Sequence, residues 1–166
     1  MIRKSHSLLL IVILLITGCD KRKPDVIDDS ETNMYNLNEL RQEVYLKGNI
    51  ESYNSLKEIY LNNVESDFLP YAMIMANKFN NTNASYDTFE LLISIDGCSI
   101  DYNLSCVDES TRDLALSYLV NAINKGHKVA SEILIEFYSK DKSYPIGNLY
   151  LDKNLMNKAK SNIIDK

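Results

Sequence analysis

The spacing of apolar residues beyond residue 35 predicts a series of short helices. The first stripe recurs every three or four residues, as on one face of a helix, and consists of Leu37, Leu40, Val44 and Tyr45. Similar stripes predict helices over residues 50–61, 67–79, 85–95, 108–125, 129–138 and 152–163. No alternation of apolar and polar residues is long enough to predict a strand. The pattern therefore predicts an all-α fold of antiparallel helix pairs.

Signals at the helix ends support these boundaries. Asp108 or Ser110 is expected to cap the helix over 108–125, and Gly126 to end it. Asp152 is expected to cap the last helix. The helix over 108–125 is expected to turn inward Leu114, Tyr118, Leu119, Ala122 and Ile123.

The first residues carry the pattern of an export signal. Arg3 and Lys4 precede an unbroken apolar run over 8–16, which is shorter than the ~20 residues that span a bilayer. The run leads into Ile16, Thr17, Gly18 and Cys19. This order resembles the lipobox of bacterial lipoproteins, and the resemblance implies cleavage after Gly18 and lipidation of Cys19. An uncleaved short anchor and a plain signal peptide are the alternatives.

Three segments follow from this reading: a signal peptide over 1–18, a lipidated Cys with a flexible linker over 19–35, and a helical domain over 36–166. The linker is expected to be flexible because it is charged and has few apolar residues to bury. Several acyl chains on one site would hold the protein stably on a membrane. We expect a cell-envelope protein, lipid-anchored and facing the periplasm. Asp20 and Lys21 leave the choice between inner and outer membrane open.

Two triplets that lie 78 residues apart point to an internal repeat. They are Lys47, Gly48 and Asn49, and Lys125, Gly126 and His127. The same offset pairs Leu56 with Leu134 and Tyr60 with Tyr138, and it is twice 39, within the range of helical-repeat proteins. Over 110–140, and less fully over 37–62, the chain resembles Sel1-like repeats, relatives of the tetratricopeptide repeat. The resemblance implies a short solenoid that binds proteins. Residues 67–95 have no glycine at the turn, so this unit is either degenerate or an insertion.

Cys98 and Cys106 lie eight positions apart in a predicted loop. In an exported chain such a pair indicates a disulfide, with two free thiols as the alternative. A metal site is poorly supported, because soft tetrahedral sites need four ligands and His127 is the only histidine after residue 18.

Charge and motifs limit the possible functions. With 18 basic and 23 acidic residues the chain has a net charge of −5, which disfavours nucleic-acid binding. Removal of 1–18, which takes two basic residues and no acidic one, leaves 16 − 23 = −7. With His127 as its one histidine, the remaining chain offers no base for a Ser-His-Asp or Cys-His site. We expect no enzyme activity, no catalytic residues, no metal and no cofactor.

Ten of the eleven tyrosines fall into two groups. Those on the apolar stripes are expected in the core: Tyr45, Tyr53, Tyr60, Tyr118 and Tyr138. Those near helix starts or in loops are candidates for partner contact, because tyrosine suits protein interfaces. These candidates are Tyr71, Tyr86, Tyr102, Tyr144 and Tyr150.

The combined features resemble small lipidated Sel1-like proteins found beside type VI secretion effectors. This resemblance implies an immunity protein that binds and neutralises a cognate antibacterial toxin, such as a phospholipase. The alternative is an envelope scaffold or adaptor that organises protein complexes. The acidic balance favours a basic or neutral protein partner for either function.

Overall fold

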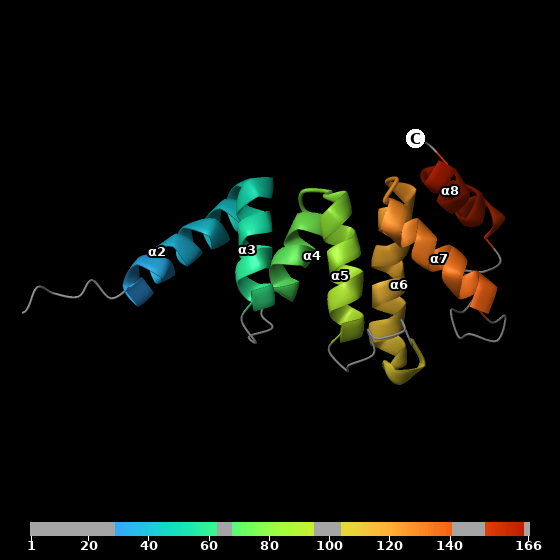
Figure 1. Ribbon diagram of the computed structural model, residues 1–166, viewed down its shortest axis with the longest axis horizontal. Helices are drawn as coiled ribbons and strands as arrows, with labels where there is room; N and C mark the ends of the chain where they lie inside the picture. The colour runs from blue at the N-terminus through green and yellow to red at the C-terminus, as the bar shows by residue number, and fades with distance from the viewer. Residues whose placement is uncertain (1–28, 63–67, 95–103, 141–151, 165–166) are drawn as a thin grey trace, which may run out of the picture. The chain divides into compact units, whose positions relative to one another are not determined.

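A computed structural model describes residues 29–62, 68–94, 104–140 and 152–164, and their regular structure is entirely helical (Figure 1). The helices are α2 (Asp29–Gln42), η1 (Glu43–Lys47), α3 (Ile50–Asn62), α4 (Leu69–Asn77), α5 (Thr82–Ser94), η2 (Leu104–Cys106), α6 (Glu109–Asn124), α7 (Lys128–Lys140) and α8 (Lys153–Ile164). Here η1 is a π-helical turn and η2 a 3₁₀ turn. The all-α fold class is confirmed for the described residues.

The chain divides into two compact units, residues 1–35 and 36–166. In the first unit, the structure describes 29–35, which form the beginning of α2. Residues 29–35, which the sequence assigns to the linker, are helical in the structure.

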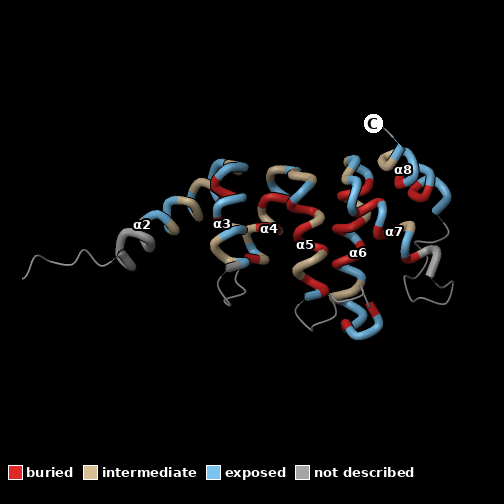
Figure 2. The backbone as a smooth tube through the Cα atoms, in the orientation of Figure 1, coloured by how far each residue is buried: buried red, intermediate tan, exposed pale blue. Residues whose placement is uncertain are grey.

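Within the second unit, each helix packs against its neighbours along the chain. α4 packs on α5 and α6 on α7, while α5 packs on α6 and α7 on α8. Additional contacts join η1 to α4 and α6 to α8. Buried residues run along the helices of this unit (Figure 2). Among the small residues buried between helices are Ala72, Ala76, Ala84, Ala115, Ala122, Ala130 and Ala159.

Three turns between helices share one geometry. Each contains a residue with positive φ: Gly48 (66°), Asn80 (56°) and Gly126 (90°). The residue after it caps the following helix by accepting a hydrogen bond from the backbone N–H three positions later. The three bonds run from Ser52 N–H to Asn49 Oδ1 (3.1 Å), from Ala84 N–H to Asn81 Oδ1 (2.9 Å) and from Ala130 N–H to His127 Nδ1 (3.2 Å). Each such bond satisfies one of the N–H groups that a helix start leaves unpaired.

The buried positions after each turn follow the same register. The residues three positions after the capping residue are all buried: Ser52, Ala84 and Ala130. The residues seven positions after it are buried as well: Leu56, Thr88 and Leu134. The pair formed by α4 and α5 therefore has the same turn as the other two. Asn80 occupies its left-handed position, which asparagine tolerates better than most residues other than glycine.

We predict that the left-handed conformation of Asn80 makes this position sensitive to substitution. Asn80→Ala should lower the free energy of unfolding by about 1 kcal/mol, because alanine lacks the local hydrogen bonding that makes this region accessible. Asn80→Gly should change it little. Asn54→Ala, at an exposed position inside α3, is the matched control and should raise the free energy of unfolding by about 0.5 kcal/mol, because alanine has the higher helix propensity. Urea unfolding followed by circular dichroism measures all three, and equal values for Asn80→Ala and Asn80→Gly would contradict the prediction.

Two residues predicted to face the core are exposed. Tyr45 is 56% exposed because Val44 takes the buried position of η1, where the wider π-helical turn carries the next side chain outward. Leu114 is 41% exposed because the buried face of α6 begins at Ala115 and Leu116. Tyr53 and Tyr118 are buried as predicted, Tyr60 packs partly on the core, and Tyr138 lies outside the residues whose burial is described.

The predicted caps of α6 and α8 are confirmed. Asp108 accepts hydrogen bonds from the Ser110 and Thr111 backbone N–H groups, and bonds from these two residues hold the pKa of its carboxyl well below the usual range. Asp152 accepts in the same way from the N–H groups of Asn154 and Leu155.

Candidate functional site

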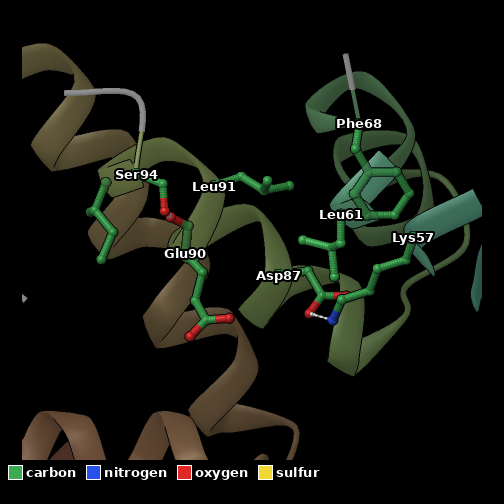
Figure 3. Close-up of a pocket in the computed structure, with 8 residues that line it drawn as sticks. Lys57, Leu61, Phe68, Asp87, Glu90, Leu91 and Ser94 are labelled. Atoms are coloured by element: carbon green, nitrogen blue, oxygen red, sulfur yellow. Dashed lines mark hydrogen bonds and ion pairs between the residues drawn. The ribbon is translucent and has the colours of Figure 1, made fainter. Parts of the chain in front are cut away.

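A pocket of about 340 Å³ lies between α3 and α5 (Figure 3). Its apolar walls include Leu61 from α3, Phe68 just before α4 and Leu91 from α5. Its polar side chains are Lys57, Asp87, Glu90 and Ser94. The pocket therefore combines apolar walls with two carboxylates and one ammonium group.

Asp87 is the most buried charged group of the pocket, with its side chain 6% exposed. Its Oδ1 accepts from the Lys57 ammonium at 2.6 Å, and its Oδ2 accepts from the Tyr53 hydroxyl at 2.7 Å. Burial, followed by the charge of Asp87, raises the pKa of Tyr53 far above its usual range. The hydroxyl therefore stays protonated and remains a donor to Asp87.

Glu90 lies one helical turn beyond Asp87 on α5 and accepts a hydrogen bond from the Tyr86 hydroxyl. The Tyr86 ring in turn stacks on His127, with ring centroids 4.5 Å apart. Because His127 caps α7, these contacts connect one side of the pocket to the turn between α6 and α7.

His127 is held in its neutral form by its surroundings. Burial lowers its pKa, the charges of Asp87 and Glu90 oppose this shift, and the charge of Lys57 adds to it. Its Nδ1 accepts the Ala130 N–H, a role that only an unprotonated nitrogen can fill. The proton of the neutral ring is therefore assigned to Nε2.

We predict that His127 makes the domain less stable in acid. Because the folded pKa lies below the unfolded value of about 6.5, the unfolded chain binds more protons between the two values. Stability should be full above about pH 6.5 and fall as the pH drops toward the folded pKa. His127→Gln should flatten this part of the profile. Urea unfolding between pH 5.5 and 8 measures both proteins, and parallel profiles would exclude the histidine as the cause.

The structure places some of the residues predicted to function and leaves others outside its description. Tyr71 is half-buried on α4, its ring 6.0 Å from that of Tyr60, and Tyr86 is half-buried in the contacts given above. Cys106 is disulfide-bonded, but its pairing with Cys98 stays a prediction. Outside the described residues lie Cys19, Cys98, Tyr102, Tyr144 and Tyr150.

The bond from Lys57 to Asp87 was not predicted from the sequence. The two residues are thirty positions apart, and local patterns do not pair residues at that distance. One signal was present: Asp87 follows Ala84 by three and precedes Leu91 by four, so it lies on the apolar stripe of α5. A carboxylate in such a place needs a partner.

Within the described ranges, no three side chains of histidine, cysteine, aspartate or glutamate are grouped so that they could hold a metal ion. In the same ranges no helix is long and apolar enough to cross a membrane. No family model, curated protein or solved structure matches the chain. Function is therefore inferred from its own residues.

Proposed function

We propose that this chain is a membrane-tethered, periplasm-facing lipoprotein whose Sel1-like helical repeats bind a protein. Its most specific form is an immunity protein that binds and neutralises a cognate antibacterial toxin, such as a type VI phospholipase effector. Lipidation of Cys19 would hold it on the membrane where such a toxin arrives.

The observation that carries this proposal is the common register of the three turns. A positive-φ residue, a capping residue and buried positions three and seven residues later recur after Gly48, Asn80 and Gly126. Contacts of α5 with α6, of α7 with α8, and of α6 with α8 join successive helix pairs. Repeat proteins are stacked from such units and offer extended surfaces that bind proteins.

Neutralisation would work by occlusion of the toxin. A protein inhibitor of ordinary size covers roughly 800 Å² on each partner, enough to close an active-site mouth. The net charge of −7 expected after removal of residues 1–18 would attract a basic surface and speed the encounter. Such a mechanism requires only that this chain has a preformed surface complementary to the toxin.

The test is to direct the product of the adjacent open reading frame to the periplasm, with and without this chain. Immunity predicts that the neighbour stops growth, that the full chain restores it, and that the two bind with nanomolar or tighter affinity. A Cys19→Ser variant tests whether the lipid is needed for protection. A harmless neighbour would contradict immunity, and a pull-down with the lipidated chain would then test the scaffold alternative, for which we expect weaker binding to several envelope proteins.

A further inference from the structure

We propose that the pocket between α3 and α5 receives an arginine side chain from the protein partner. This inference rests on the proposed function, since it names the chemistry by which the partner is recognised. The occupant is a single guanidinium with its aliphatic stem, supplied by a basic segment of the partner.

The charges of the pocket point to a cationic occupant. Its side chains supply two carboxylates, Asp87 and Glu90, and one ammonium, that of Lys57. Lys57 pairs with Asp87 at 2.6 Å, whereas Glu90 receives a neutral hydroxyl from Tyr86. One negative charge is thus left uncompensated, and one incoming cation would balance it when the partner excludes water.

The apolar walls select the shape of that cation. Leu61, which is 67% exposed, lies across the pocket from Leu91, with Phe68 beside it (Figure 3). An arginine stem can lie between these walls while its flat guanidinium donates several hydrogen bonds in a fixed geometry. Lysine has a compact, strongly hydrated head that makes poorer use of such walls. A pocket of about 340 Å³ has room for one such side chain.

The position of the pocket suits an anchor for a protein partner. Arginine is enriched among the few residues that dominate binding energy, and these residues insert into pockets near the centre of an interface. The half-buried Leu91 and the exposed Leu61 would both be covered by a bound partner. Burial of these leucines would shield the ion pair between guanidinium and Glu90 from water.

The probe is N-acetyl-arginine N-methylamide, titrated into the full chain in detergent while the methyl signals of Leu61 and Leu91 are followed by NMR. We expect saturable shifts at millimolar concentration. Glu90→Gln, which retains the oxygen that accepts from Tyr86, should weaken binding at least fivefold. Glu132→Gln removes the same charge from an exposed site on α7 and should change nothing. N-acetyl-norleucine N-methylamide, which has an apolar side chain, should bind at least fivefold more weakly.

The outcomes separate this inference from the proposed function. Equal binding of the norleucine and arginine amides would mean an apolar anchor and overturn the inference, as would absence of shifts or equal affinity of Glu90→Gln. If protection from the toxin is nevertheless observed, the proposed function stands and only the arginine pocket fails. If arginine binds in the expected manner while the neighbour is harmless, immunity fails and the pocket belongs to a different basic partner.

Discussion

Gly48→Ala is expected to lower the free energy of unfolding by about 3 kcal/mol, because two costs add at this position. The backbone of Gly48 has a φ of 66°, which side chains other than glycine rarely adopt. A Cβ at Gly48 would also lie 2.3 Å from Cδ1 and 2.4 Å from Cγ of the Phe79 ring. No carbon contact of that length is tolerated, so the ring or the turn has to move.

Gly126→Ala is the matched comparison, because it has the strain without the contact. Gly126 has a φ of 90°, and the nearest atom to its added Cβ is Oδ1 of Asn162 at 4.0 Å. We therefore expect a loss of about 1 kcal/mol from backbone strain alone. Urea unfolding at pH 7 gives both values.

A double-mutant cycle tests the role of the ring. In a Phe79→Ala background the cost of Gly48→Ala should fall to about that of Gly126→Ala, because the obstructing atoms are gone. Equal costs in both backgrounds would show that the ring does not resist the methyl group. The cycle therefore measures how closely the first turn packs on the residue that follows α4.

The sequence predicted the helices well because local rules set them. Gly126, Asp108 and Asp152 marked ends that the structure confirms, since caps and left-handed turns depend on neighbouring residues alone. The turn at Asn80 was missed because asparagine takes the positive-φ position that glycine occupies in the other two turns. Asparagine only sometimes adopts a positive φ, so its presence in the sequence does not identify such a turn.

One error about burial arose where a helix departs from regular geometry. Tyr45 fits an ideal apolar stripe, but η1 is π-helical. The Lys78 ammonium lies 5.4 Å from the centre of the Tyr45 ring, so this ring contacts a charged side chain and not the core. Periodicity assumes a regular helix and so cannot show where a π-turn begins.

The pocket could not be predicted from the sequence, because it is formed by contacts between helices that are distant along the chain. Tyr53 and Lys57 lie one turn apart on α3 and meet Asp87 only when α3 packs beside α5. The register of α5 marks Asp87 as unusual, yet it does not identify the partner. Pairing between elements distant in the sequence requires the packing itself.

The second large effect is expected at Lys57. Lys57→Met keeps most of the aliphatic side chain but removes the ammonium from the buried Asp87 carboxylate, to which the Tyr53 hydroxyl still donates. An uncompensated buried charge costs about 3–5 kcal/mol of folding free energy. The Lys57 side chain is 35% exposed, so water reaches the pair and reduces this cost. We therefore expect the free energy of unfolding to fall by about 2–3 kcal/mol.

Asp87→Asn should cost less, about 1 kcal/mol, because the amide oxygen still accepts from Tyr53 and the ammonium of Lys57 can turn into water. In the double variant Lys57→Met/Asp87→Asn no charge is left unpaired, so its loss should be smaller than the sum of the two single losses. Urea unfolding of the four proteins at pH 7 measures this coupling. Strictly additive losses would mean that Lys57 stabilises α3 by its contacts with neighbouring side chains, independently of the carboxylate, and that the ion pair contributes nothing to the packing of α3 on α5.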